Sequence, residues 1–580
     1  MRGGQVDQQR YDIAIIGSGI GGSILATILS KEGVRVVVIE ESQHPKFAIG
    51  ESMILESSEI FRQLAETYDI PEIAYYSSEN FKSLVGSTHG IKRHFSYMYH
   101  KKDQEENPGE LMMANIPKEP YGHEMHIYRQ DCDYFYCALA IKYGATVIQN
   151  AKIQDLEIDH SGVELKLANG RTIHSSYVVD ASGFRSILAN KYKLRKYDLE
   201  THSRAIFTHA VNVPSFHKVA NTQEEYGIPY SLHEGTLHHV FEGGWLWIIP
   251  FDNHKDTTND FCSIGLLLDP RVYPERSELS AEEEFFEFIL KFPGINKQLK
   301  NCKSVRDWTR TGRIQYSTKK VIGERFCLLG HAAGFIDPLF SKGLYITLTS
   351  IHTLAPQIIK SVKENNFETA RYQNYEDTVF RFIESNDKLI ARAYKSFTDF
   401  RVWRKFVVLW VLGAYLEYLK LTLLRFKAHY SDNKRDMYSY YSEIDLRLVG
   451  GGFEKFNELE KKVYEILDSI NFEDTQDVEE KSQHIFSILL KSEWIPFAIR
   501  RYFVENHLNS NQFNLAFLKN KGGILGTTEY RRHFFGELPT LWLLREFFYE
   551  KYRYSAANLK KKKFNAYEKF DRFVHIGETV

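Results

Sequence analysis

The stretch from residue 11 to residue 41 reads YDIAIIGSGIGGSILATILSKEGVRVVVIEE and decides the fold. A β-branched apolar run at 13–16 leads into glycines with the spacing G-x-G-x-x-G, and apolar residues with a helical period follow. Gly17 lets the chain turn, Gly19 lets the backbone approach a pyrophosphate, and Gly22 lets the helix pack close to the strand. The order of strand, turn and helix predicts a dinucleotide-binding unit.

A second strand and an acidic residue complete this unit. Residues 34–39, VRVVVI, are β-branched except for Arg35, and Glu40 follows them about twenty residues after the glycines, where a carboxylate can accept hydrogen bonds from a ribose. The helix N-terminus offers free N–H groups to the phosphates. The alternative is a chance glycine-rich turn, because a lone G-x-G-x-x-G is weak evidence. The complete pattern favours nucleotide binding.

Composition narrows the range of functions. Lysine plus arginine (74) nearly cancels aspartate plus glutamate (75), so the charge balance indicates no nucleic-acid partner. The five cysteines have neither a C-x-x-C pair nor metal-ligand spacing, which predicts no metal site and a reduced, cytoplasmic setting. No apolar leader precedes Tyr11, and the longest apolar run, 406–416, is too short for a transmembrane segment.

The pattern along the chain predicts an α/β protein with two regions. Residues 1–350 form the nucleotide-binding module, and 351–580 form a helical C-terminal region. Within the module, strand-like segments between about 203 and 268 predict a substrate-side β-sheet. Residues 75–120 are polar and aromatic, with several glycines and prolines, and predict an excursion over the surface of the nucleotide domain.

Three stretches resemble flavin monooxygenase-like proteins. Arg129 opens a helix similar to the one whose arginine approaches the flavin, although an isolated arginine is more often a surface residue. The sequence VVDASG, which contains Asp180, resembles the second flavin signature. LLGHAA at 328–333 resembles a G-D-A-A stretch whose aspartate holds the ribityl chain, but His331 stands in its place. An imidazole can still hydrogen-bond a hydroxyl. The resemblance, over about 345 residues, implies a Rossmann-like FAD-binding domain of this type.

Two further motifs resemble those of flavin-dependent halogenases. WLWIIP at 245–250 matches their W-x-W-x-I-P box, and FIDPLFSKG at 335–343 matches their F-x-x-P-x-x-S-x-G. Alone, the first would indicate a core strand with two aromatics on one face. In the family, the tryptophans separate flavin from substrate, and N–H groups after the serine form a chloride or bromide site. The resemblance assigns Trp245, Trp247 and Pro250 to the barrier, Ser341, Lys342 and Gly343 to the halide, and Ser52 and Asp337 to the cofactor.

The family also places a lysine between flavin and substrate, about thirty residues past a G-E-[AS] motif. Here GES at 50–52 is followed by Phe-Lys at 81–82, so the resemblance implies that Lys82 is catalytic. Hypohalous acid formed at the flavin would reach this lysine, which can hydrogen-bond it or carry the halogen as a chloramine. This role needs a partly desolvated amine. The alternative is a solvated surface lysine.

Position 340 bears on the substrate. Tryptophan halogenases have a glutamate immediately before the serine of the last motif, whereas this chain has Phe340. Phenol and pyrrole halogenases commonly have an apolar residue there, because their substrates are activated without that carboxylate. The resemblance therefore implies a phenolic substrate. The sequence does not assign its general base among Asp103, His123 and His126.

The C-terminal region lies beyond these motifs. Its Trp403, Trp410 and Tyr415 either line a substrate pocket or belong to an ordinary core. The lysine run at 560–563 is either a solvated face or a docking patch for an acidic carrier protein.

The leading hypothesis is a two-component enzyme. It would accept reduced FAD (FADH2) from a separate flavin reductase, bind O2, and chlorinate or brominate a phenolic ring, free or tethered to a carrier protein. One alternative is a flavin-dependent aromatic hydroxylase of the same fold. Another is a catalytically silent flavoprotein that serves as a partner in a biosynthetic complex. A halide-dependent change in product mass would separate the first hypothesis from the other two.

Overall fold

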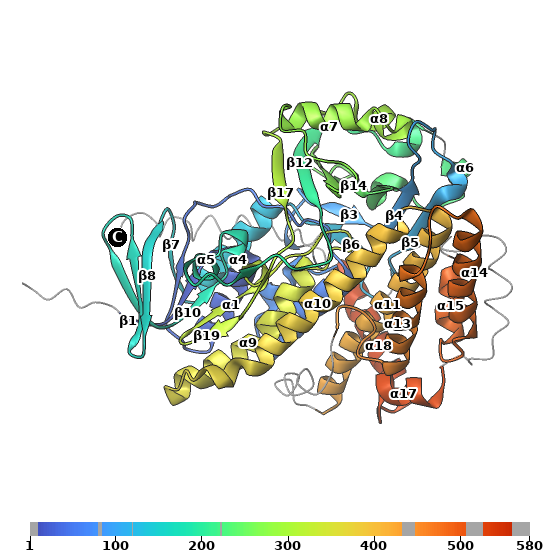
Figure 1. Cartoon of the computed structure of the whole chain (residues 1–580). Coiled ribbons are helices and arrows are strands. Elements are labelled where there is room, and N and C mark those ends of the chain that lie inside the picture. The colour runs from blue at the N-terminus through green and yellow to red at the C-terminus, as the bar shows by residue number, and fades with distance from the viewer. Residues whose placement is uncertain are drawn as a thin grey trace, which may run out of the picture.

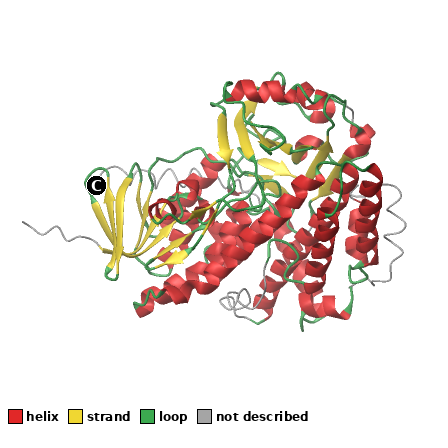
Figure 2. Cartoon of the chain, in the orientation of Figure 1, coloured by secondary structure: helices red, strands yellow, loops and turns green. Residues whose placement is uncertain are grey.

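The computed structural model describes residues 10–78, 80, 84–118, 120–220, 223–431, 447–505 and 526–559. Within these ranges the chain forms two eight-stranded sheets and a group of long helices. Figure 1 shows the first sheet on the left, the second above the centre and the C-terminal helices on the right, and Figure 2 shows the same division by element type. Lys82 and the lysine run at 560–563 lie outside the described residues.

The first sheet confirms the predicted Rossmann unit. Its strands follow the order β19 (Ile322–Gly323), β20 (Phe326–Leu328), β10 (Thr172–Asp180), β1 (Arg10–Ile16), β2 (Val36–Ile39) and β7 (Thr146–Ile148). Strands β8 (Ile153–Asp159) and β9 (Gly162–Leu167) form a hairpin, and β9 pairs with β10. From β20 to β7 all pairs are parallel. Residues 13–16 and 36–39 are fully buried, because helices cover a parallel sheet on both faces.

The glycine turn has the geometry that the sequence predicts. Gly17 adopts φ +97°, and a Cβ atom there would lie 2.8 Å from the Ala181 carbonyl oxygen. A Cβ atom on Gly22 would lie 2.1 Å from the Gly17 carbonyl oxygen, so helix α1 (Ile20–Lys31) can pack this close to the turn only with glycine there. At Gly19 the nearest atom to such a Cβ is 3.8 Å away. That position faces open space, which a ligand can occupy.

The second sheet contains the predicted strands of 203–268 and more. Its order is β16 (Lys303–Ser304), β12 (Arg204–Val211), β15 (Cys262–Leu268), β14 (Gly244–Pro250), β13 (Thr236–Phe241), β4 (His94–Tyr99) and β5 (Leu111–Asn115), with β17 (Thr309–Arg313) also paired to β12. Residues 75–120 were predicted to cross the surface of the nucleotide domain, whereas part of this segment forms β4 and β5. All six residues of β4 are buried. The polar residues of β4 hid its strand pattern, because both faces of this strand are covered by protein.

Several shorter elements lie between the strands of the two sheets along the chain. The small sheet of β3 (Gly90–Lys92) and β6 (Glu124–His126) lies at the start of β4, and β11 (Arg195–Lys196) pairs with β18 (Ser317–Thr318). The short helices are α5 (Ile187–Lys191), α6 (Gln223–Tyr226), α7 (Ala281–Ile289) and α8 (Pro293–Leu299). Helices α2 (Leu55–Thr67) and α4 (Arg129–Lys142) follow the nucleotide strands.

Long helices fill the C-terminal region, as predicted. The long helices are α9 (Gly343–Glu364), α10 (Gln373–Ser396), α11 (Phe400–Tyr430), α13 (Glu454–Asp468), α14 (Thr475–Lys491) and α18 (Thr540–Leu559). Two short helices, α15 (Phe497–Glu505) and α17 (Thr528–Phe535), lie between α14 and α18 along the chain. Helix α9 crosses residue 350, the predicted boundary between the two regions, and contacts α1 and α2. The two regions therefore share this helix.

Helix α11 is long and apolar enough to cross a membrane by length and composition alone, which the eleven-residue apolar run did not reveal. However, 67% of its most apolar window is buried inside the protein. It contacts α2, α10, α13, α14 and α17. These contacts are those of a core helix in a globular protein.

Candidate active site

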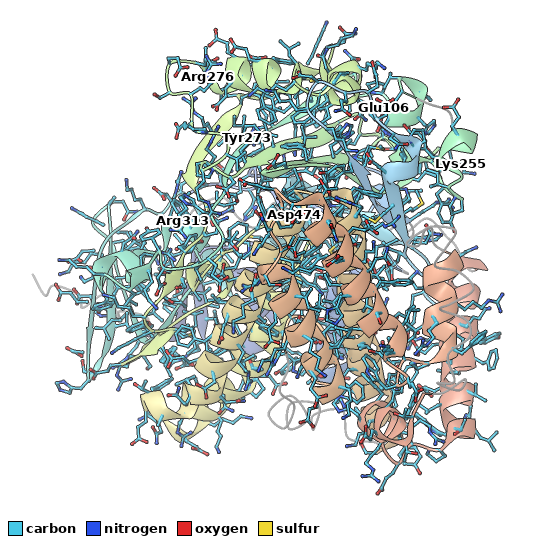
Figure 3. All side chains as sticks on the ribbon, turned by 45° about the vertical axis from the view of Figure 1, so that its right-hand side comes forward. Glu106, Lys255, Tyr273, Arg276, Arg313 and Asp474 are labelled. Carbon is cyan, nitrogen blue, oxygen red and sulfur yellow. The ribbon has the colours of Figure 1, made fainter. Side chains whose placement is uncertain are left out.

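A cavity of about 1240 Å³ runs from the glycine turn to the tryptophan box of β14. This volume exceeds the roughly 300–1,000 Å³ that is usual for sites of drug-sized ligands, as a dinucleotide requires. Arg313 is part of its lining and is labelled in Figure 3, where the substrate-side sheet meets the nucleotide-binding part. The predicted residues that line this cavity are Gly17, Gly19, Glu40, Ser52, Arg129, Trp245, Trp247, His331, Asp337, Ser341 and Gly343.

Glu40 is held at the end of β2 with one oxygen atom still able to accept. Its Oε2 accepts from the backbone N and from Oγ of Ser18, both at 2.9 Å, and lies 2.5 Å from Lys46 Nζ. Its Oε1 accepts only from the Ser42 amide, at 2.9 Å. Burial alone would raise the pKa of Glu40, but Lys46 and the two amides lower it below its ordinary value. The ionised carboxylate suits a ribose hydroxyl.

The side chain of Arg129 is held in the cavity wall by hydrogen bonds to neighbouring residues. Its Nε and Nη2 donate to the two carboxylate oxygens of Asp133, at 2.8 and 2.9 Å, one helical turn along α4. Its Nη1 donates to the carbonyl oxygens of Ile49 and Gly50. The guanidinium group therefore fixes the loop that leads into Ser52, and lines the cavity while doing so.

Asp180, predicted to bind the cofactor, does not line the cavity. Its carboxylate accepts four hydrogen bonds: from the amide and hydroxyl of Ser182, from the Ser186 hydroxyl and from the Leu188 amide. These bonds hold the turn after β10, and Ser182 and Gly183 of that turn do line the cavity. Asp180 is therefore a positioning residue. Gly22 likewise acts through packing rather than through the cavity wall.

The N-terminus of α9 faces the cavity through Ser341 and Gly343. Ser341 has φ +56°, a left-handed conformation that turns the chain into the helix. Lys342 does not line the cavity, because its side chain turns away to Glu56, with 2.5 Å between Nζ and Oε1. His331 faces Gly343 from within the cavity, and desolvation followed by the charge of Arg129 lowers the pKa of His331 to about 4. Its neutral ring offers one donor and one acceptor.

The tryptophan box forms the opposite wall. Trp245 and Trp247 alternate along β14, so both rings lie on the same face of the strand, with centroids 5.8 Å apart. Their indole nitrogens donate to Tyr394 Oη and to Ser263 Oγ, each at 3.1 Å. Pro250, predicted as part of this barrier, does not line the cavity. Its carbonyl oxygen instead accepts from His126.

Asp337 links this wall to the C-terminal helices. Its Oδ2 accepts from Tyr394 Oη at 2.9 Å and from Ser203 Oγ at 3.0 Å, and its Oδ1 accepts from the Leu339 amide at 3.0 Å. Burial raises the pKa of Asp337 to about 7, against the lowering effect of these hydrogen bonds. Because Tyr394 also receives the indole N–H of Trp245, Asp337 fixes the barrier through α10.

A buried lysine that the motif spacing did not single out lies beside the cavity wall. Lys92, at the end of β3, has no solvent-exposed surface. Its Nζ donates to Ser52 Oγ and to the Met53 carbonyl oxygen, each at 2.7 Å, and lies 3.4 Å from the centre of the Phe95 ring. Burial lowers the pKa of Lys92 well below its ordinary value of 10.5. A lysine within the buried, aromatic-rich stretch GIKRHFSYMY was the available sequence signal.

A chain of hydrogen bonds continues from Lys92 along the cavity wall. Ser52 Oγ lies 2.8 Å from Thr236 Oγ1, which lies 2.9 Å from His126 Nε2, and His126 Nδ1 lies 2.9 Å from the Pro250 oxygen. The carbonyl can only accept, and burial keeps the pKa of His126 well below 6.5, so the neutral ring donates from Nδ1. Each hydroxyl then donates toward His126, and Lys92 donates into the chain.

The other two residues considered as the general base, Asp103 and His123, lie away from the cavity. Asp103 sits in an exposed turn with φ +59°, and His123 packs against Tyr230. Neither lines the cavity. Phe340 is buried, stacks on Trp410 with 4.4 Å between ring centroids, and does not line the cavity.

Comparison with known proteins agrees with this geometry. Residues 88–444 match the family model described as "Tryptophan halogenase", and residues 15–49 match "NAD(P)-binding Rossmann-like domain". The chain belongs to the flavin-dependent halogenase family. This halogenase has FAD as its cofactor, with a halide and O2 as co-substrates, and it acts on an aromatic substrate. The family assignment sets aside the silent-flavoprotein and hydroxylase alternatives.

Three relatives show how far the similarity extends. The halogenase is 41% identical to monodechloroaminopyrrolnitrin halogenase PrnC of Pseudomonas fluorescens over 74% of this chain and 76% of the relative. It is 40% identical to tetracycline 7-halogenase of Kitasatospora aureofaciens, over 69% and 72% of the two chains. The crystal structure of halogenase PltM with phloroglucinol and FAD superposes with a TM-score of 0.79 at 31% identity, covering 85% of this chain and 98% of PltM.

Proposed function

We propose that this halogenase chlorinates or brominates a phenolic ring, and that a lysine relays the halogen from the flavin side to the substrate side. The observation that carries the proposal is the buried amine of Lys92, which hydrogen-bonds Ser52 of the cavity wall while it lies over the Phe95 ring. A fully buried lysine is rare. Buried Glu124 faces Lys92 across the β3–β6 pair, and the charges of Glu124 and Glu56 only partly offset the effect of burial on the pKa of Lys92.

The residues of the cavity suit FAD. Gly17 and Gly19 would hold the pyrophosphate at the N-terminus of α1, Glu40 would hold the ribose, and His331 would contact the ribityl chain. When bound and reduced, the flavin supplies with O2 the oxidising power that converts a halide ion into hypohalous acid. The amides at the start of α9, beside Ser341 and Gly343, would hold the halide.

The hydrogen bonds of Lys92 leave its nitrogen ready to react. A neutral amine has two N–H groups and one lone pair, and the two N–H groups are taken by Ser52 and Met53. The lone pair is therefore free to react, and hypohalous acid from the cavity would reach it when the Ser52 side chain, which separates Lys92 from the cavity, moves aside. An N–H and the O–halogen bond break, an N–halogen and an O–H bond form, and water leaves. On transfer, the halogen passes to the ring and the ring proton returns to nitrogen. Lys82 stays the prediction from motif spacing.

The phenolic substrate is inferred from the environment of Phe340. Its ring fills the position of a carboxylate with an apolar group that stacks on Trp410. An indole ring would lack a carboxylate to stabilise its cationic intermediate here, whereas a phenol supplies electrons from its own oxygen. The relative PltM, which has been crystallised with phloroglucinol, also supports a phenol. We further propose a separate flavin reductase as partner and a cytoplasmic setting.

One assay tests the proposal. The purified protein, FAD, O2, NADH and an unrelated flavin reductase are combined with phloroglucinol, hydroxybenzoyl compounds, their carrier-bound thioesters, and tryptophan, under chloride and then bromide. We expect halogenated phenols whose mass follows the halide supplied. Products that gain oxygen and no halogen would show hydroxylation instead. Halogenation of tryptophan without any halogenated phenol would refute the phenolic assignment.

A further inference from the structure

An aromatic seam lies behind the tryptophan barrier, between β4 and α11. We define it as Phe95 and Tyr97 of β4, Trp403 and Trp410 of α11, and Phe340. The Tyr97 ring meets Trp403 edge-on at 5.3 Å and Trp410 at 6.0 Å, and Phe95 meets Trp410 at 5.3 Å. Figure 1 shows β4 above the upper end of α11, which agrees with these contacts.

The seam is one ring away from the flavin cavity. Tyr97 stacks on His238 at 4.6 Å, and His238 lies 5.5 Å from Trp245. Both His238 and Trp245 line the cavity. At its other end the seam contains Phe95, over which the amine of Lys92 lies. The seam therefore links the cavity wall at His238 to the amine of Lys92.

Three polar atoms of the seam have no hydrogen-bond partner in the described part of the chain: Tyr97 Oη, Trp403 Nε1 and Trp410 Nε1. Their side chains are at most 3% exposed, so water does not satisfy them. Burying such a group unpaired costs about 1–3 kcal/mol, and each case in a protein needs an explanation. By contrast, the indole nitrogens of Trp245 and Trp247, in the neighbouring wall, are both bonded.

We propose that Tyr97, Trp403 and Trp410 form the substrate-recognition site, and that their free donors bind oxygen atoms of an aromatic substrate. This inference rests on the proposed function. Indole N–H groups only donate, so the ligand must carry acceptors such as phenolic or carbonyl oxygens. The seam rings are in contact, so the substrate enters by exchanging the stacking of Phe340 on Trp410 for its own stacking. Ring hydroxyls, more than ring size, then decide which aromatics are accepted.

The test compares Tyr97→Phe, Trp403→Phe and Trp410→Phe with Trp308→Phe. Trp308 also has an unpaired indole nitrogen, but it packs on Phe285 on the opposite face of the second sheet, which makes it a matched control. Calorimetry measures phloroglucinol binding to the FAD-loaded enzyme, and mass spectrometry measures KM and kcat. Inhibition by 1,3,5-trimethylbenzene, a competitor without oxygen atoms, measures ring stacking in the absence of hydrogen bonds.

We expect each seam variant to weaken phloroglucinol binding and to raise KM roughly three- to tenfold, the worth of one hydrogen bond. Inhibition by trimethylbenzene should be unchanged in Tyr97→Phe, and Trp308→Phe should match the wild type. The Tm of Tyr97→Phe should not fall, because the change deletes an unpaired hydroxyl.

The inference is overturned by unchanged phloroglucinol affinity in all three variants, by no binding to the wild type, or by a marked loss of Tm in Tyr97→Phe, which would reveal a partner for its hydroxyl. Weaker binding in the variants together with no halogenated phenol from the wild type would refute the proposed function and leave the recognition site standing.

Discussion

Lys92→Met separates the lysine relay from flavin chemistry. Methionine has nearly the length of lysine and keeps the contact with Phe95, but it leaves Ser52 Oγ and the Met53 carbonyl without their donor. Each orphaned acceptor costs about 1–3 kcal/mol. Removing the amine also removes the free-energy cost of burying it, which is of similar size. The net loss in the free energy of unfolding should therefore stay below about 3 kcal/mol. The variant should therefore fold.

The expected result is a loss of halogenated phenol by about 10²–10⁴-fold, the range for a positioned acid–base group. Flavin-dependent O2 consumption should be unchanged, because Lys92 touches the cavity only through Ser52. Hypohalous acid that is no longer captured would leave the protein, so a soluble β-diketone scavenger should be halogenated faster than by the wild type. Lys82→Met is assayed in parallel. Wild-type halogenation by Lys92→Met, with loss in Lys82→Met, would refute the reasoning and restore the residue that motif spacing predicts.

Three further predictions concern the cavity and its surroundings. Gly19→Val should fold normally, because the nearest atom to a Cβ there is 3.8 Å away, yet it should purify without FAD; a full flavin spectrum would disprove the assignment of the turn. Burial raises the pKa of Asp337 to about 7 from 3.8, so the folded chain keeps a proton that the unfolded chain releases, and stability falls as the pH rises from about 4 to 7. Flavin-free Asp337→Asn should therefore have a Tm close to that of the wild type near pH 5 and a higher one near pH 8; equal pH profiles would contradict this. Phe340→Glu should lower the yield of halogenated phenol, because it places a carboxylate against Trp410, and a higher yield would show that the substrate needs the carboxylate.

The sequence predicted local features well and distant pairings poorly. Gly17 and Gly22 could be assigned because backbone geometry within one turn demands glycine, and Trp245 and Trp247 because alternation puts both on one strand face. Asp180 was placed by motif, but a motif does not give the direction of a side chain, and its carboxylate turns toward the residues of the turn after β10. The backbone N–H of Lys342 stays a prediction for the halide site.

The lysine proposed here as the relay shows a different limit. Spacing from the G-E-S motif predicts Lys82, which lies outside the described residues. The burial of Lys92 depends on β3 pairing with β6 and on β4 pairing with β13, which no local pattern shows. The buried histidine and hydroxyl groups beside it looked like ordinary polar residues. Only the folded sheet shows that they form one chain of hydrogen bonds.

The parallel pairing of β4 with β13 also governs when the proposed relay site is complete. Residues 95–99 pair with residues 236–240, so this edge of the sheet closes only after much of the chain has been made, and contacts of such sequence separation form slowly. A slip by one residue would turn every side chain of β4 to the opposite face. Until the register is correct, Lys92 lacks the burial and the hydrogen bonds on which the proposed relay depends. The site proposed for the relay is thus the product of completed folding, and a partly folded chain lacks it.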